Sequence, residues 1–215
     1  MTITYELGNS LYVNLTNRCS NACSFCVRQK HDGVNGKDNL WLDREPTVDE
    51  IKADFEKRDI SKYDAVVFCV DGSDLSKYEE LVFCGYGEPM IRWDDILEVA
   101  KWLKGKNPLT QIRINTNGQA NLINKRDITP ELEGVVDTVS ISLNAENAEK
   151  YQAVCMSDFG EAAYDALLEF ARLAKKYVPE VVLSVVDVMS DAEIEKCRRI
   201  AQECGVSFRV RAYIE

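Results

Sequence analysis

The apolar positions of the chain repeat with two alternating periods, one typical of strands and one typical of helices. Short runs rich in branched and aromatic residues recur along the chain, and amphipathic stretches lie between them. The runs that predict strands are 11–17, 65–70, 80–84, 111–115, 138–144, 181–188 and 207–214. The stretches that predict helices are 47–58, 94–105, 146–156, 160–177 and 190–204, with one or two helical turns expected in 128–134.

Two of the predicted helices carry recognisable end signals. Thr47 is followed three residues later by Glu50, which is the pattern of a capping box at a helix start. The helix over 94–105 is expected to be capped by Asp94 and to end at Gly105. These signals predict where the first of these helices begins and where the second begins and ends.

The order of the elements predicts the fold class. A strand-then-helix pattern without a break in composition indicates an α/β fold, in which helical crossovers join parallel strands. We count six principal strands and place 65–70 in a small insertion at about 59–78. A complete eight-fold barrel needs about 250 residues. The 215 residues therefore predict an incomplete (β/α)6 TIM-like barrel, with the whole chain 1–215 forming one domain.

Composition narrows the classes of partner and compartment. The net charge of −10, from 36 acidic and 26 basic residues, argues against a nucleic-acid partner. The N-terminus has no signal-peptide pattern, and the longest apolar runs are too short to span a membrane, so we expect a cytoplasmic protein. In that reducing compartment the eight cysteines are not expected to form a disulfide framework.

Polar, glycine-rich or thiol groups follow four successive strands. A cysteine loop follows 11–17, GYGEPM follows 80–84, TNG follows 111–115, and Asn144 ends the run TVSISLN. Within that run, Ser140, Ser142 and Asn144 share one face because side chains alternate along a strand. Chemistry in α/β barrels lies at the carboxyl ends of the strands, so we expect these segments to form one site.

The cysteine loop has the spacing C-x3-C-x2-C, at Cys19, Cys23 and Cys26. One alternative is an apolar stripe on a helix, but the intervening residues have no apolar period. Another is zinc, but structural zinc takes four ligands and no C-x2-C pair remains elsewhere. The pattern favours an iron–sulfur cluster. Three thiolates on a four-iron cubane leave one iron open to a small molecule.

The loop Cys-Ser-Asn-Ala-Cys-Ser-Phe-Cys over 19–26 resembles the radical S-adenosylmethionine (SAM) superfamily. GYGEP is similar to the glycine-rich segment that holds the methionyl part of SAM in that family, and INTNG and VSISLN resemble its next two strand-end segments. The resemblance implies that a [4Fe–4S] cluster binds SAM and cleaves it reductively. The product is a 5′-deoxyadenosyl radical, which abstracts hydrogen from a substrate that the sequence does not identify.

The resemblance also implies roles for individual residues. The cluster ligands would be Cys19, Cys23 and Cys26. The SAM contacts would be Phe25, Gly85, Gly87, Glu88, Asn115, Asn117, Ser142 and Asn144. Glu88 would lie beside the SAM ammonium group, and Asn115 or Asn117 would bond the ribose. Phe25 as a core plug and GYGEP as an ordinary turn are the alternatives. Arg209 or Arg211 is a candidate for a cofactor carboxylate or substrate contact, or for a surface ion pair.

NLTNRCSNACSFCVR and VFCGYGEP look most like the TatD family-associated radical SAM proteins, which implies a functional link to a TatD-like hydrolase. The family's chemistry implies an electron donor such as flavodoxin or ferredoxin and sensitivity to oxygen. A glycyl-radical-type activase or a peptide modifier acting on a protein partner is an alternative within the enzymes. A non-catalytic iron–sulfur electron-transfer protein is the alternative from another class, and SAM cleavage distinguishes it.

Overall fold

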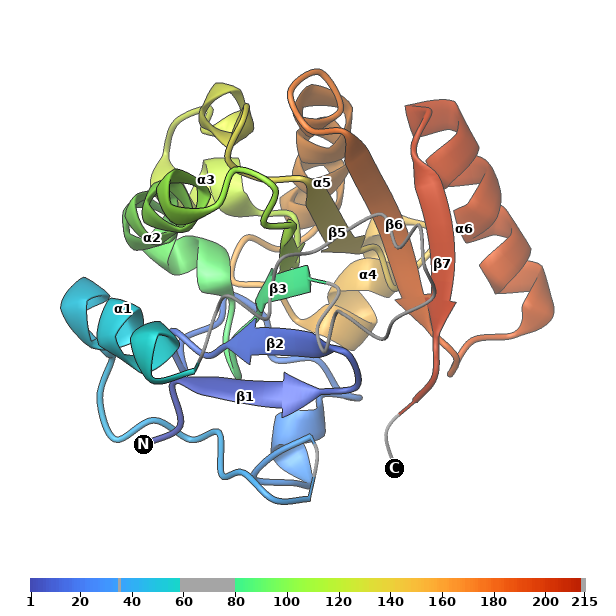
Figure 1. Ribbon diagram of the computed structural model, residues 1–215. Helices are drawn as coiled ribbons and strands as arrows, with labels where there is room; N and C mark the ends of the chain where they lie inside the picture. Colours follow the sequence, from blue (N-terminus) through green and yellow to red (C-terminus); the bar gives the residue numbers. More distant parts are fainter. Residues whose placement is uncertain (35, 59–79, 214–215) are drawn as a thin grey trace, which may run out of the picture.

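The computed structural model describes residues 1–34, 36–58 and 80–213, and its strands form one sheet in the order β1 to β7 (Figure 1). The strands are β1 Thr4–Leu7, β2 Ser10–Val13, β3 Glu80–Phe83, β4 Ile112–Thr116, β5 Thr138–Ser142, β6 Glu180–Val186 and β7 Ser207–Arg211. The helices are α1 Val48–Lys57, α2 Trp93–Lys106, α3 Ala120–Asn124, α4 Ala148–Cys155, α5 Ala162–Ala174 and α6 Asp191–Cys204. Short 3-10 turns, η1, η3 and η4, span Val27–Gln29, Pro89–Arg92 and Thr129–Leu132.

The six principal strands of the prediction are confirmed as β2 to β7, and each pairs in parallel with the next. Strand β1 was not predicted. It pairs antiparallel with β2 through a tight hairpin, in which Gly8 adopts a φ of 59° that favours glycine. The predicted insertion at about 59–78, with its strand 65–70, lies outside the described residues.

Helix boundaries follow the local signals in one case and depart from them in another. The capping box of Thr47 and Glu50 is present at the start of α1. The expected ends of α2 are wrong, because Arg92 precedes its first turn and the helix continues through Gly105 to Lys106. Asp94 lies inside the first turn, where its charge favours the helix dipole, and Gly105 does not take the left-handed conformation of a cap.

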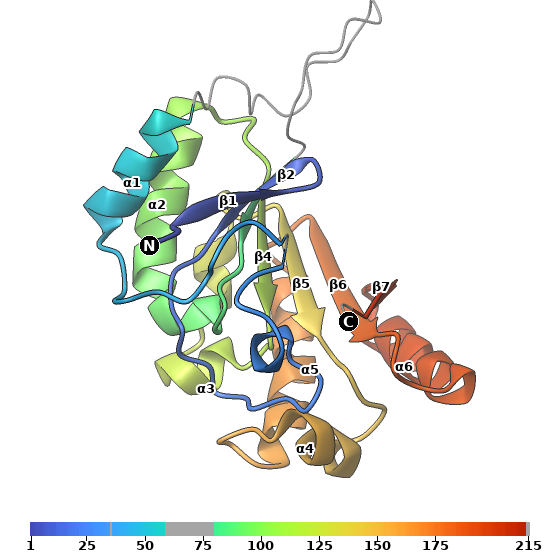
Figure 2. The ribbon, with the colours of Figure 1, turned by 90° about the horizontal axis from the view of Figure 1, so that it is seen from below.

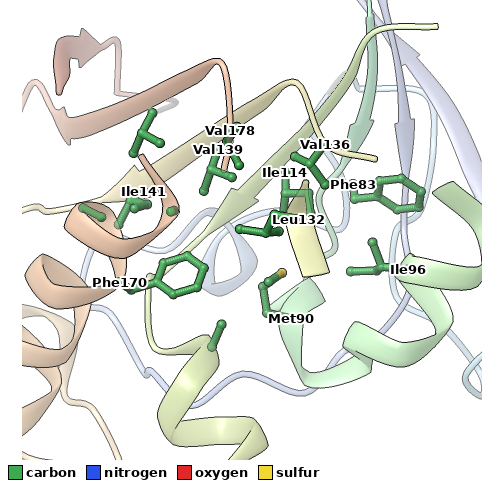
Figure 3. Packing of buried hydrophobic residues seen from close by; sticks show 14 of the residues in the cluster. Phe83, Met90, Ile96, Ile114, Leu132, Val136, Val139, Ile141, Phe170 and Val178 are labelled. Atoms are coloured by element: carbon green, nitrogen blue, oxygen red, sulfur yellow. The ribbon is translucent and has the colours of Figure 1, made fainter. Parts of the chain in front are cut away.

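The two faces of the sheet differ in polarity because side chains alternate along each strand. One face is apolar and packs against the helices, as Figure 3 shows for Phe83, Ile114 and Ile141 facing Met90 and Phe170. The helices cover this outer face along the whole arc of strands (Figure 2). The opposite, inner face carries polar side chains on β4, β5 and β7. Chemistry that needs polar groups is therefore confined to the inner face and the strand ends.

Within the described ranges, no helix combines the length and the apolar character needed to cross a bilayer.

Candidate functional site

The cysteine loop leaves the carboxyl end of β2 and is held against the end of α4. The amide of Ala22 donates to the carbonyl of Cys155 at 3.0 Å, and the amide of Ser24 donates to that of Val154 at 2.9 Å. Asn21 and Ser157 form an antiparallel bridge between the two segments. All three loop cysteines are partly exposed. The backbone of the loop is thus fixed while its thiols stay accessible.

A buried hydrogen-bond network centred on Gln119 supports the loop from below. The Gln119 Oε1 atom accepts from the Ser20 and Ser157 hydroxyls at 2.8 and 3.1 Å. Its Nε2 atom donates to Asn21 Oδ1 at 2.8 Å and to the Tyr151 hydroxyl at 3.0 Å. Gln119 is fully buried, and every polar atom of its side chain has a partner. Such a satisfied network holds its members in one arrangement.

Residues 85–88 dock directly on the backbone that precedes the cysteines. The amide of Gly87 donates to the Thr16 carbonyl at 2.8 Å, and the amide of Glu88 donates to the Arg18 carbonyl at 2.7 Å. A Cβ on Gly87 would lie only 2.0 Å from the Arg18 carbonyl oxygen. Gly87, a predicted SAM contact, therefore closely approaches the chain's own loop. Glycine is required there by packing, since its φ is not positive.

The carboxylate of Glu88 points inward and caps two neighbouring segments. Its oxygens accept from the amide of Met90 at 3.0 Å, the hydroxyl of Thr116 at 2.7 Å and the amide of Asn117 at 2.7 Å. Burial raises the pKa of Glu88 to about 7, although these three hydrogen bonds oppose the shift. A carboxylate has about four acceptor positions, of which these hydrogen bonds use three.

The loop thiols lie in different surroundings. Burial raises the pKa of the Cys19 thiol to about 12. A hydrogen bond from the buried Cys155 thiol lowers the pKa of Cys23, and the same contact together with burial raises the pKa of Cys155. No three His, Cys, Asp or Glu side chains in the described part of the chain lie close enough to hold a single metal ion. A cubane differs from a single ion, because each thiolate binds a different iron.

The predicted SAM contacts fall into two groups in the structure. Asn117 is fully engaged, because its amide nitrogen donates to Ser20 Oγ at 2.9 Å and its Oδ1 accepts from the amide of Gln119 at 3.0 Å. Asn115 and Asn144 instead each have a buried Oδ1 atom without a hydrogen-bond partner. The amide of Asn115 contacts the Cys84 thiol, and that of Asn144 contacts Cys155. Two free acceptors therefore remain at the ends of β4 and β5.

Ser142 and Phe25 have protein partners of their own. The Ser142 hydroxyl accepts from Arg211 Nη2 at 3.3 Å, so it faces β7 across β6. Phe25 is partly exposed and packs against the main core, as the core-plug alternative requires. The role of either residue in cofactor binding stays a prediction.

Sequence analysis missed the residues that support the loop. Gln119, Tyr151 and Ser157 lie far from the cysteines in sequence, and their importance depends on partners up to 130 residues away. The only local signal for Gln119 was the polar character of the segment after β4, and an ordinary turn would have the same character. The Cys155 thiol was expected to be a core residue, and it is buried, but its contact with Cys23 had no sequence signal.

The comparisons with known proteins agree with this geometry. The sequence profile of the radical SAM superfamily matches residues 13–201. No match is found among curated protein sequences. A solved radical SAM methyltransferase from Sphaerobacter thermophilus is 18% identical, with a TM-score of 0.62, over 97% of this chain and 57% of that chain. The structure of SuiB from Streptococcus suis bound to S-adenosylmethionine is 16% identical, with a TM-score of 0.59, over 97% of this chain and 40% of that chain.

Methylornithine synthase (PylB) is 14% identical, with a TM-score of 0.62, over 95% of this chain and 53% of that chain. At these identities the likeness concerns the fold alone. The predicted incomplete barrel with parallel strands is confirmed, because these neighbours are radical SAM enzymes with a partial TIM-barrel core. The chain spans about half the length of the three solved structures.

Proposed function

Because the chain belongs to the radical SAM superfamily, we propose that Cys19, Cys23 and Cys26 hold a [4Fe–4S] cluster that binds SAM and cleaves it for hydrogen abstraction. The superfamily implies these two cofactors and an enzymatic function. The observation that carries the residue assignment is a loop with three accessible thiols, held at the carboxyl end of the parallel strands. When bound, the reduced cluster supplies the electron that converts SAM into a 5′-deoxyadenosyl radical.

The residues around the loop fit the two cofactors in chemistry. Three thiols are suitable donors for iron, and metal binding deprotonates them even where burial raises the pKa, as at Cys19. The unpartnered Oδ1 atoms of Asn115 and Asn144 are acceptors for hydroxyl or ammonium groups of SAM. The remaining acceptor position of Glu88 suits the same ammonium group, since a buried carboxylate is stabilised by a cation. Gly87 and Asn117 hold the loop that these groups surround, and a Cβ on Gly85 would lie 3.1 Å from the Thr16 carbonyl oxygen.

The remaining expectations belong to the same proposal. The enzyme acts as one domain in the cytoplasm and receives electrons from a donor such as flavodoxin or ferredoxin. The resemblance of NLTNRCSNACSFCVR and VFCGYGEP to the TatD family-associated group supports a functional link to a TatD-like hydrolase. A protein or peptide substrate is compatible with a sheet whose edge strands, β1 and β7, do not pair with each other.

The proposal is tested by anaerobic reconstitution of the chain with iron and sulfide. The wild-type protein is expected to hold about four irons and to form 5′-deoxyadenosine from SAM after reduction. Cys23→Ala is expected to lose both the iron and the formation of 5′-deoxyadenosine. Cys204→Ala, at a buried position in α6, should keep the iron and the activity. Absence of 5′-deoxyadenosine from the iron-loaded wild type under every reductant tried would refute the enzymatic proposal.

A further inference from the structure

Three arginines lie on the inner face of the sheet, and among the described residues only Arg113 has a carboxylate counter-ion. Arg113 on β4 pairs with Glu80 Oε1 at 2.5 Å and also reaches the Tyr12 hydroxyl. Arg209 and Arg211 on β7 form no ion pair with a carboxylate anywhere in the described ranges. The chain as a whole is acidic, with a net charge of −10. Two unneutralised guanidinium groups on one face are therefore a local exception to the charge of the molecule.

The side chains of Arg209 and Arg211 lie across β6 and reach β5. Arg209 Nη2 donates to Ser140 Oγ, and Arg211 Nη2 donates to Ser142 Oγ, each at 3.3 Å. By register, β6 lies between these strands and places Ser184 opposite Arg209. Ser184 is buried, and its hydroxyl donates to the Ile141 carbonyl. The two guanidinium groups thus make parallel contacts with β5, Arg211 from a partly buried position and Arg209 from an exposed one.

This arrangement is unfavourable for the protein alone. Burial and the charge of Arg209 both lower the pKa of Arg211. The Nε atom of Arg211 is buried and has no hydrogen-bond partner. Arg211 thus loses solvation without gaining a counter-ion from the described residues, and both planar guanidinium groups have donors left for an oxyanion.

We propose that Arg209 and Arg211 together bind an oxyanion group, a carboxylate or a phosphate, of the enzyme's substrate. The pair would hold that group on the inner face, where Arg211 interacts electrostatically with Cys84 at the end of β3 and with Cys23 of the cysteine loop. As a substrate contact, this assignment rests on the proposed radical SAM function. It narrows the substrate from an unknown molecule to an anionic one.

The test measures anion binding without catalysis. Inorganic phosphate and succinate are titrated separately into the cluster-loaded, unreduced protein by calorimetry, against chloride at the same ionic strength. At least one probe is expected to bind the wild type. The double variant Arg209→Gln/Arg211→Gln should bind it at least about tenfold more weakly, the factor expected for loss of one charge-assisted hydrogen bond. Tighter binding of phosphate indicates a phosphorylated substrate, and tighter binding of succinate indicates a carboxylic acid.

Two further variants separate this role from a structural one. Arg211→Lys keeps the charge but loses the planar fork, so its affinity should lie between those of the wild type and the double variant. Arg199→Gln removes an exposed arginine of α6 and should bind the probe as the wild type does. Circular dichroism of each variant verifies that it is folded.

The proposal is overturned if neither probe binds the wild type, or if the double variant binds as tightly as the wild type. It is also overturned if the variants lose SAM affinity, measured by equilibrium dialysis, while anion binding is unchanged, since the arginines would then serve SAM. Formation of 5′-deoxyadenosine by the wild type is assayed separately. Its absence contradicts the proposed function, whereas anion binding by the arginine pair is decided by the titration alone.

Discussion

Replacing Gly87 with alanine should separate the segment after β3 from the cysteine loop. The added Cβ would lie 2.0 Å from the Arg18 carbonyl oxygen and 2.7 Å from that of Thr16. Both atoms belong to the backbone, so relief requires the two segments to move apart. That movement breaks two amide–carbonyl hydrogen bonds of 2.8 and 2.7 Å, each worth about 1 kcal/mol. With an overpacking cost of about 1–3 kcal/mol, Gly87→Ala should destabilise the chain by about 3–5 kcal/mol.

The assay is urea unfolding of the metal-free protein under reducing conditions, followed by iron analysis after anaerobic reconstitution. Gly105→Ala is the matched control, because a Cβ there meets no atom within 4 Å and the residue lies in the last turn of α2. That control should gain about 0.5–1 kcal/mol from helix propensity and keep its iron. If Gly87→Ala lowers the free energy of unfolding by less than about 1 kcal/mol and keeps its full iron content, the contact of residues 85–88 with the backbone of Thr16 and Arg18 does not hold the loop.

Three further substitutions examine the surroundings of the loop. Gln119→Leu leaves its buried partners short of hydrogen bonds, so it should lower the free energy of unfolding in urea by about 2–4 kcal/mol and reduce the iron retained. The control Gln202→Leu, at an exposed position, should change neither quantity. Equal effects of the two substitutions would contradict the network. Because the pKa of Glu88 is raised to about 7, between about pH 4.5 and 7 the folded chain keeps a proton that the unfolded chain releases. The free energy of unfolding should therefore fall by about 3 kcal/mol as the pH rises through this range. Glu88→Gln should remove that slope in urea titrations across this range, and an unchanged slope would refute the assignment. Cys155→Ala removes a hydrogen bond to the thiol of Cys23, one of the proposed cluster ligands. An anaerobic redox titration should therefore find a more negative cluster potential than in the control Cys204→Ala, and an unchanged potential would contradict the proposed contact.

The parts of the fold that depend on local pattern could be predicted from the sequence. Buried strands such as β6 carry continuous branched apolar residues, and α1 has its capping box, so periodicity and end signals are sufficient. Strand β1 was missed because its four residues are too few to establish an alternating period, and it lacks the continuous apolar run that identified β3. The end of α2 was misplaced because a glycine near a helix end need not be its cap.

For the candidate site, the sequence could predict on which face of a strand a side chain lies, but not which residues of other strands it meets. Alternation along β5 placed Ser140 and Ser142 on one face, and both do face the inner side, where they meet Arg209 and Arg211. The identity of those partners could not be predicted, because residues 69 apart in sequence are brought together by the order of the strands. The same holds for Gln119, whose partners come from two other segments of the chain.

The buried polar groups of this site divide into two kinds with different consequences. Gln119, Asn117 and Glu88 have partners from several segments, so they fix the loop, and changing them should cost stability. Asn115 and Arg211 each keep a buried polar atom without a partner, which costs the folded protein free energy and gives it no contact in return. Asn115 on β4 and Arg211 on β7 are predicted contacts of the cofactor or the substrate. Stability thus accounts for the first kind, and ligand binding is the physical reason we infer for the second.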